Sequence, residues 1–424
     1  MNIKSMRLRL ASASVKFALF FLIVIAVCNS GYGQSDNKIS IGEVVSIQSA
    51  VLNENRKIWI YLPPSARSTT YAKRQYPVVY LLDGDAHFYS VVGMIQQLST
   101  VNGNMISPEM IVVGIPNTDR TRDLTPTHVA TDPMMGPDFV KTSGGGEKFL
   151  SFIETELIPY VDSKYPTAPY RMLIGHSLGG LIVMEALVRH TGLFNSYVAI
   201  DPSMWWDDQV LLKETKKALA EKQLAGRSLY LGIANTMDEG MDIKTVRNDK
   251  SDDTKHIRSI LDLRDYLEAN KQNGMRYQGK YYSGDDHGSV PLIAEYDALH
   301  FFFDFYRLKL TSKDFTDPTV DLADKYEKHF RKVSEGIGYD IKPTEAMINS
   351  TAYQLLAQKL FKKAEGMFKL NVKNYPTSFN VFDSYGDYFV AMGDTKNAIV
   401  QLEKALTLKD NPATKKKLEK LQGK

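Results

Sequence analysis

The residues best suited to chemistry form the run Gly175-His176-Ser177-Leu178-Gly179-Gly180. An apolar, β-branched run precedes it and an apolar helical pattern follows it, which is the setting of a G-x-S-x-G turn between a strand and a helix. Such a turn exposes the serine hydroxyl, and a Cβ at Gly175 or Gly179 would collide with the neighbouring strand and helix. The start of the helix favours negative charge that develops beside it. The spacing therefore predicts that Ser177 is a nucleophile.

A serine hydroxyl is a weak nucleophile until a base removes its proton. In this arrangement an acid and then a histidine follow the serine along the chain. The histidines after Ser177 are His190, His256, His287, His300 and His329. Four of them fall within helical patterns, whereas His287 directly follows a strand-like run. We therefore predict that His287 is the base, the alternative being a surface loop histidine.

The acid is expected in the loop after the strand-like run 228–234, where three carboxylates occur. A buried carboxylate there would orient the imidazole and stabilise its cationic form. We predict Glu239, which is followed by Gly240 and lies well into the loop. Asp238 and Asp242 remain alternatives.

Two backbone N–H groups are expected to form an oxyanion hole. One belongs to Leu178, the residue after the nucleophile, and the other comes from the loop after the strand-like run 76–82. We predict the amide of Asp85 for the second donor. Asp83 is expected to brace this loop rather than to do chemistry.

The elements that must position these residues alternate between strands and helices from about residue 40 to 310. Apolar strands that alternate with helices predict an α/β fold with a mostly parallel sheet covered on both faces. The runs 44–52 and 56–62 read as an antiparallel hairpin at one edge of that sheet. The segment 131–146, which is rich in glycine and proline, reads as a loop. The remaining predicted strands are 76–82, 110–115, 170–174, 196–200, 228–234 and 276–282, and the predicted helices are 88–98, 148–165, 178–189, 209–222, 255–270 and 293–308.

Five motifs in this order resemble the putative esterase family of α/β-hydrolases, which includes esterase D and the enterochelin (siderophore) esterases. The motifs are Tyr80-Leu81-Leu82-Asp83-Gly84, Arg122-Asp123-Leu124-Thr125-Pro126-Thr127, Gly175-His176-Ser177-Leu178-Gly179-Gly180, Asp201-Pro202-Ser203-Met204-Trp205-Trp206 and Asp286-His287-Gly288-Ser289. The resemblance covers roughly residues 40–310 and is nearest to the siderophore-esterase branch. It implies the α/β-hydrolase fold, Ser177 as nucleophile and His287 as base.

The resemblance also implies that Arg122 and Trp205 or Trp206 lie near the substrate. The alternatives are an Arg122 that pairs with neighbouring carboxylates and a tryptophan pair that belongs to the core. The family leaves the acid open, because some siderophore-type members resemble a serine–histidine dyad without a firm third residue.

The strand signal disappears after about residue 310. Segments 313–343 and 344–424 read as a connector helix and a helical repeat, in which Ala364 matches Ala398 and Phe368 matches Leu402 at a spacing of 34 residues. Small residues let paired helices approach closely while the larger ones fill the space between them. The spacing resembles that of tetratricopeptide repeats. We expect this part to pack on the connector or the main domain, or to bind a protein partner.

The first 33 residues contain four basic residues and no acidic one, with an unbroken apolar run of 11 residues at 17–27. That run is short for a bilayer, which needs about 20 apolar residues, but it suits a secretory signal. Cleavage after Gly33 predicts a periplasmic or secreted protein whose main domain is 34–312. The alternatives are an uncleaved anchor and a lipoprotein through Cys28, which the bulky Val27 disfavours.

Composition narrows the function further. The 424 residues include 52 basic and 49 acidic ones, so the chain is nearly neutral and has no electrostatic footprint for nucleic acid. A single cysteine excludes a disulfide framework, and no metal-binding or dinucleotide motif is present, so we predict no metal and no organic cofactor. These features predict an exported serine esterase that acts on a small-molecule ester. The alternatives are an acyltransferase with the same triad and a non-catalytic interaction protein.

Overall fold

The computed structural model describes residues 39–132 and 135–423. The predicted signal sequence, with Cys28, lies outside these residues. Residues Gly42–Lys424 group together as one unit. None of the helices in the described ranges is both long and apolar enough to span a membrane.

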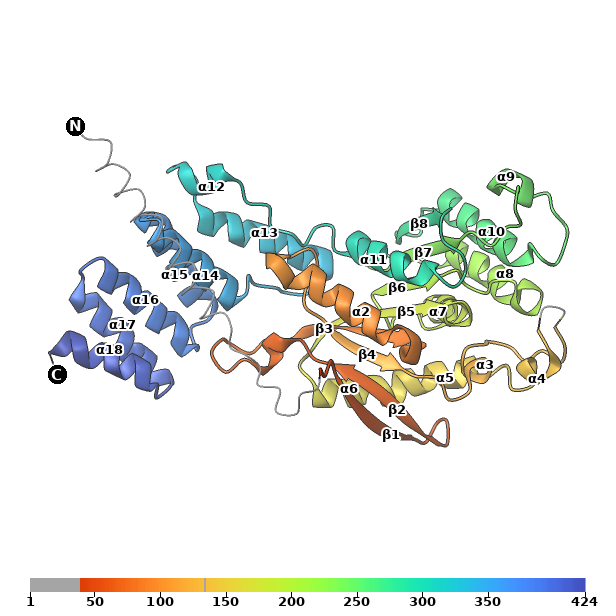
Figure 1. The fold of residues 1–424 in the computed structure, drawn as a ribbon, viewed down its shortest axis with the longest axis horizontal. Helices are drawn as coiled ribbons and strands as arrows, with labels where there is room; N and C mark the ends of the chain where they lie inside the picture. Colours follow the sequence, from red (N-terminus) through yellow and green to blue (C-terminus); the bar gives the residue numbers. More distant parts are fainter. Residues whose placement is uncertain (1–38, 133–134, 424) are drawn as a thin grey trace, which may run out of the picture. The chain divides into compact units, whose positions relative to one another are not determined.

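In the described part of the chain, eight strands form one sheet in the order β1-β2-β4-β3-β5-β6-β7-β8 (Figure 1). Strands β1 and β2 pair antiparallel, β2 pairs antiparallel with β4, and every other neighbouring pair is parallel. The predicted hairpin is thus confirmed at one edge of a mostly parallel sheet. The bounds are β1 (Glu43–Ser49), β2 (Glu54–Tyr61), β3 (Tyr76–Leu82), β4 (Ile111–Ile115), β5 (Thr167–His176), β6 (Ser196–Ile200), β7 (Ser228–Ala234) and β8 (Arg276–Tyr282).

Helices cover both faces of this sheet, which is why its central strands are apolar on both sides. Strands β3, β4 and β6 are buried along their whole length. Helix α2 (Gly84–Ser99) contacts α11 (Val290–Phe302), while α8 (Trp206–Glu221) contacts both α7 (Leu178–Arg189) and α10 (Lys255–Ala269). The helices thus form two groups, and the expected α/β-hydrolase architecture is confirmed.

Shorter elements occupy the connections. The segment predicted as a loop, 131–146, is largely irregular but includes the four-residue helix α4 (Pro137–Val140). The predicted helix 148–165 is divided by a π-helical turn, Ile153–Leu157, between α5 (Gly146–Phe152) and α6 (Ile158–Lys164). The remaining short elements are the 3₁₀ turns Pro64–Arg67 and Val101–Gly103 and the helices α3 (Arg120–Asp123) and α9 (Ile243–Val246).

After β8, the described chain contains helices and loops but no strand. Two helical pairs begin 34 residues apart, at Glu345 and Phe379, as the sequence spacing predicts. Leu322 and Tyr326 of the connector are buried in one cluster with Phe368. The helices therefore pack on the connector, whereas their classification as tetratricopeptide repeats and the exact domain limits stay predictions. The bounds are α12 (Ser312–Thr316), α13 (Leu322–Ile337), α14 (Glu345–Ala357), α15 (Phe361–Asn374), α16 (Phe379–Ala391), α17 (Thr395–Leu408) and α18 (Pro412–Gln422).

The helical segment also contacts the domain that carries the sheet. Glu345, only 2% exposed, accepts a hydrogen bond from the backbone N–H of Ala72 at 2.7 Å and from the side chains of Ser378 and Asn380 at 2.9 Å each. Lys409 Nζ donates to the carbonyl of Thr69 at 3.1 Å. This part of the chain therefore packs intramolecularly.

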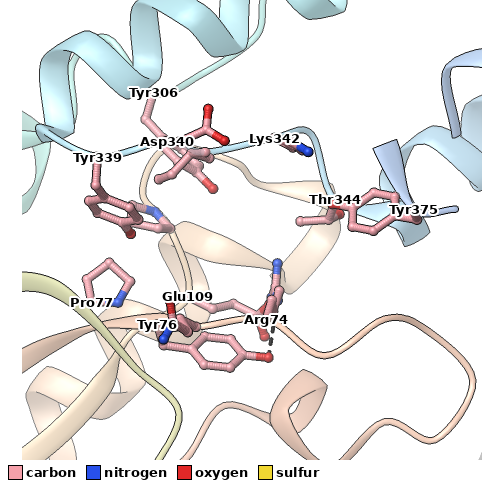
Figure 2. A pocket seen from close by; sticks show the side chains of 13 residues that line it. Arg74, Tyr76, Pro77, Glu109, Tyr306, Tyr339, Asp340, Lys342, Thr344 and Tyr375 are labelled. Atoms are coloured by element: carbon pink, nitrogen blue, oxygen red, sulfur yellow. Dashed lines mark hydrogen bonds and ion pairs between the residues drawn. The ribbon is translucent and has the colours of Figure 1, made fainter. Parts of the chain in front are cut away.

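A cavity of about 210 Å³ lies beside this contact. Figure 2 shows Tyr306 and Tyr339 on one side of it and Arg74 and Tyr76 on the other. Arg74 Nε donates to the Tyr76 hydroxyl at 3.1 Å, and the guanidinium also pairs with Glu109. Tyr76 and Pro77, which line the cavity, are at the start of β3. Asp83 follows the opposite end of the same strand.

Glu345→Ala is expected to lower the free energy of unfolding by about 2 kcal/mol or more, because several donors lose a buried charged acceptor. The measurement is chemical denaturation of the purified protein. Glu335→Ala, which removes an exposed glutamate of α13, is the matched control and should change little. Equal destabilisation by both substitutions would contradict the importance of this contact.

Candidate active site

Ser177 lies at a strained turn between β5 and α7. Its backbone has φ 59° and ψ −117°, an unusual conformation for a residue with a side chain. Its N–H donates to the carbonyl of Ile200 at 2.9 Å, and its own carbonyl accepts from Ser203 N–H at 3.0 Å. A Cβ at Gly175 would lie 2.4 Å from the carbonyl oxygen of Gly179, so only glycine fits there. The structure thus has the predicted elbow, tied to the end of β6.

His287 lies in the loop after β8, as predicted. The Asp286 carboxylate accepts from the N–H groups of Gly288 and Ser289 at 3.0 and 2.9 Å, which fixes the turn around the histidine. The side chain of His287 is 42% exposed. One ring nitrogen, Nδ1, is turned inward to a carboxylate.

That carboxylate belongs to Asp201, not to the predicted Glu239. Nδ1 of His287 lies 2.6 Å from Oδ2 of Asp201, which is fully buried. Glu239 and Asp238 are exposed, and Asp242 caps the short helix α9. The prediction of Glu239 as the partner of His287 is corrected, because the 235–242 loop presents its carboxylates to solvent, whereas Asp201 directly follows β6, beside β5.

Three donors surround the Asp201 carboxylate. Oδ1 accepts from Ala234 N–H at 2.9 Å, and Oδ2 accepts from His287 and also from His256 Nε2 at 2.8 Å. Burial opposes ionisation of this carboxyl, but the hydrogen bonds from His256 and His287 hold its pKa well below the usual range. Asp201 is therefore ionised near neutral pH and can orient a histidine ring.

The rings of His287 and His176 are close, with centroids 4.5 Å apart. His176 precedes Ser177 directly, so His287 lies over the same end of the sheet as the serine. Burial, followed by the neighbouring His287, lowers the pKa of His176 to about 3. His176 is therefore neutral and serves as packing beside the elbow.

The two predicted oxyanion donors are both at helix starts. Leu178 is the first residue of α7 and Asp85 the second of α2, positions whose N–H groups have no partner within their own helix. Asp83 accepts from Arg120 Nε at 2.7 Å, and the same guanidinium donates to the carbonyl of His176 at 3.3 Å. Arg120 thus ties the loop after β3 to the elbow, and Asp83 braces it as expected.

The residues expected near substrate have internal partners instead. The Arg122 guanidinium binds both carboxylate oxygens of Glu54, at 2.8 and 3.0 Å, and its Nε donates to Asp123 at 2.7 Å. Trp205 and Trp206 are 3% and 1% exposed. The alternatives of a paired charge and core aromatics therefore describe these side chains in this structure.

Sequence reasoning missed Asp201 and His256. The available signal for Asp201 was its place directly after an apolar strand next in sequence to the nucleophile strand and helix. His256 falls in a helical pattern, and nothing in its local sequence indicates that α10 turns it toward Asp201.

Asp201, His256 and His287 each offer one possible metal-ligand atom, all within 4.8 Å of one another. The hydrogen bonds to the shared carboxylate account for this close approach. The absence of metal and cofactor chemistry stays a prediction.

Comparison with known proteins gives the class. The family model described as "Putative esterase" matches residues 49–288, more than half of the chain. The chain therefore belongs to the putative esterase family, a class of carboxylesterases with the α/β-hydrolase fold.

The chain is similar in sequence to proteins that are named as siderophore esterases. The chain is 29% identical over 286 residues to the ferri-bacillibactin esterase BesA of Bacillus subtilis, covering 63% of this chain and 92% of the relative. It is 32% identical over 154 residues to the siderophore enterobactin esterase of Emericella nidulans, covering 34% of this chain. It spans about half, 51%, of that second relative.

Solved structures agree. An IroE-like serine hydrolase from Shewanella oneidensis has a TM-score of 0.65 and 30% identity, covering 78% of this chain and 98% of that one. An uncharacterised protein from Capnocytophaga ochracea, 19% identical with a TM-score of 0.55, covers 90% of this chain and 100% of its own and shares the fold.

Asp201 makes a prediction about acid stability. Because its pKa is lowered on folding, it stabilises the native state above the unfolded carboxyl pKa of about 4, and this contribution is lost as the pH falls below that value. Denaturation of the wild type should therefore become easier toward low pH more steeply than that of Asp201→Asn.

Asp238, an exposed carboxylate in the loop after β7, provides the control. Asp238→Asn should follow the wild-type curve. Parallel pH curves for the wild type and Asp201→Asn would contradict the ionised, stabilising carboxylate.

Proposed function

We propose that this protein is an exported serine esterase that hydrolyses carboxylic esters through an acyl-enzyme on Ser177. The observation that carries the proposal is the hydrogen bond from His287 Nδ1 to Asp201, beside a serine at a glycine-bounded elbow. This combination supports a triad of Ser177, His287 and Asp201, because a serine needs a base and the base needs an orienting group.

The hydrogen bond defines the protonation of the base. An ionised carboxylate only accepts hydrogen bonds, so Nδ1 of His287 carries a proton, and in the neutral ring the lone pair is on Nε2. That lone pair takes the Ser177 proton as the hydroxyl oxygen attacks the ester carbonyl. Asp201 then stabilises the imidazolium ion that forms.

The tetrahedral intermediate places negative charge on the former carbonyl oxygen. The N–H groups of Leu178 and Asp85 are proposed to receive it, supported by their positions at the starts of α7 and α2. The imidazolium protonates the departing alcohol, leaving the acyl group on Ser177. Water then attacks with His287 as base again, which releases the carboxylic acid and the free serine.

The substrate class proposed is a siderophore-type ester. Two features support it. Several relatives are named as siderophore esterases, including one for triacetylfusarinine C in Aspergillus fumigatus. In addition, helix α11 begins three residues after His287 and exposes the apolar side chains of Leu292, Ile293 and Tyr296.

Export is proposed from residues 1–33 alone, whose basic start and apolar run suit a secretory signal. Fractionation of cells that make the full chain, with amino-terminal sequencing of the product, tests it. A mature protein beginning near residue 34 outside the cytoplasm is expected, and an intact amino terminus in the cytoplasm would contradict it.

Ser177→Ala is expected to abolish ester turnover while leaving the fold intact, because it removes the oxygen proposed to attack the ester. The assay is an ester panel containing a trilactone siderophore, a feruloyl ester, an acetylated sugar and a simple aryl ester. Turnover of the trilactone above the others supports the substrate class. Full activity of the variant on any of them would overturn the mechanism.

Asp201→Asn should reduce kcat by roughly 10⁴-fold, the order found when a triad carboxylate is replaced by its amide. The measurement is steady-state hydrolysis of the best ester in the panel. Glu239→Gln is the matched control and should remain within about twofold of wild type, since exposed side chains away from a site contribute little. The reverse ranking would restore Glu239 as the acid.

A further inference from the structure

We propose that His256 is a positioning residue that sets the pH range of catalysis by sharing the Asp201 carboxylate with His287. The proposal rests on the function proposed above. Its basis is that both imidazoles donate to the same oxygen: Nε2 of His256 lies 2.8 Å from Oδ2 and Nδ1 of His287 lies 2.6 Å from it.

The geometry makes this sharing specific. The two rings are nearly perpendicular, at 85°, with centroids 5.2 Å apart. They therefore approach the carboxylate from different directions rather than replacing each other. His256 is 9% exposed and belongs to α10, whereas His287 belongs to the loop after β8.

His256 cannot itself be the base that serves Ser177. Its Nε2 faces the carboxylate, and a neutral imidazole with the proton there leaves only Nδ1 as an acceptor. His287 presents the opposite pattern, with Nδ1 inward and Nε2 free. His256 thus acts on the reaction only through Asp201.

The other charged groups around α10 have partners of their own. Lys255 Nζ lies 3.4 Å from Asp208 of α8, and Arg258 donates to Thr254 and to the carbonyl of Ser251. The His256 ring contacts Asp201, from the end of β6, and His287, from the loop after β8. His287 in turn faces His176, from the end of β5, and adjoins Asp286 in its own loop. Nε2–H of His256 donates whether that ring is neutral or protonated.

Because His256 and His287 share the Asp201 carboxylate, Asp201 stabilises a protonated His287 less. A carboxylate oxygen that already accepts one hydrogen bond stabilises a second donor less, since its charge is partly compensated. With His256 present, His287 keeps its free lone pair to lower pH. Without it, the imidazolium is stabilised and the active form appears only at higher pH.

The test is the pH dependence of kcat/KM in His256→Leu. The midpoint of the acidic limb should move upward by about one pH unit, the equivalent of one hydrogen bond to a charged group. On the alkaline plateau, kcat per active site should stay within about threefold of wild type. Active-site titration corrects for any fraction that fails to fold.

Two variants separate tuning from general support of the fold. His256→Gln keeps a side-chain N–H near the position of Nε2 and should restore the midpoint. His329→Leu removes a partly buried histidine of α13, whose Nε2 lies 2.9 Å from the backbone carbonyl oxygen of Tyr306. This variant should leave the midpoint unchanged. A purely structural role would lower stability and active fraction without moving the midpoint.

An NMR titration of the His287 ring in a Ser177→Ala background makes the same measurement without activity. The ring should hold its proton to a pH about one unit higher in His256→Leu than in the parent. An unchanged titration in both the kinetic and the NMR experiment would overturn the proposal. If no ester is hydrolysed but the titration moves, the function proposed above fails while the coupling stands.

Discussion

The site depends on one buried carboxylate. Asp201 is removed from water, stays ionised because three N–H groups point at it, and directs one of its oxygens at His287. An isolated buried charge would be costly, and these donors together stabilise it. The same contacts that stabilise the charge of Asp201 direct Nδ1 of His287 inward, which leaves Nε2 as the nitrogen that can accept a proton.

The parallel sheet brings these groups together. The elbow with Ser177, the bend at Asp201 and the loop with His287 follow β5, β6 and β8, and the ends of parallel strands meet at one edge. Backbone hydrogen bonds connect these segments: the N–H groups of Ser177, Asp201 and Asn235 donate to the carbonyls of Ile200, Gly232 and Asp285, respectively. Strand order, rather than sequence proximity, thus brings His287 to the end of the sheet where Ser177 lies.

Most of the architecture was predictable because its causes are local. The strands 76–82, 196–200 and 228–234 coincide with the predicted runs, since a buried parallel strand must be apolar on both faces. Strand 276–282 also coincides with its predicted run, although it lies at the edge of the sheet and is only partly buried. The turn at Ser177 was equally predictable, because a strained turn of this kind requires glycines at fixed positions beside the serine.

The carboxylate that pairs with His287 could not be predicted in the same way. Its identity depends on which carboxylate the turns after two neighbouring strands direct inward, and Glu239 and Asp201 both follow apolar strands. The bend at Asp201 turns its carboxylate toward His287, whereas the longer loop leaves Glu239 in water. His256 was hidden for a related reason, since it lies on a helix and meets Asp201 only through tertiary packing.

The central claim is that Ser177, activated by His287, takes the acyl group. Intact-mass and peptide mapping of the protein after treatment with a fluorophosphonate tests it most directly, because this reagent reacts with serines that a base activates. The account predicts a single adduct, on the peptide that contains Ser177. No adduct, or one on a different residue in protein that still hydrolyses esters, would contradict it.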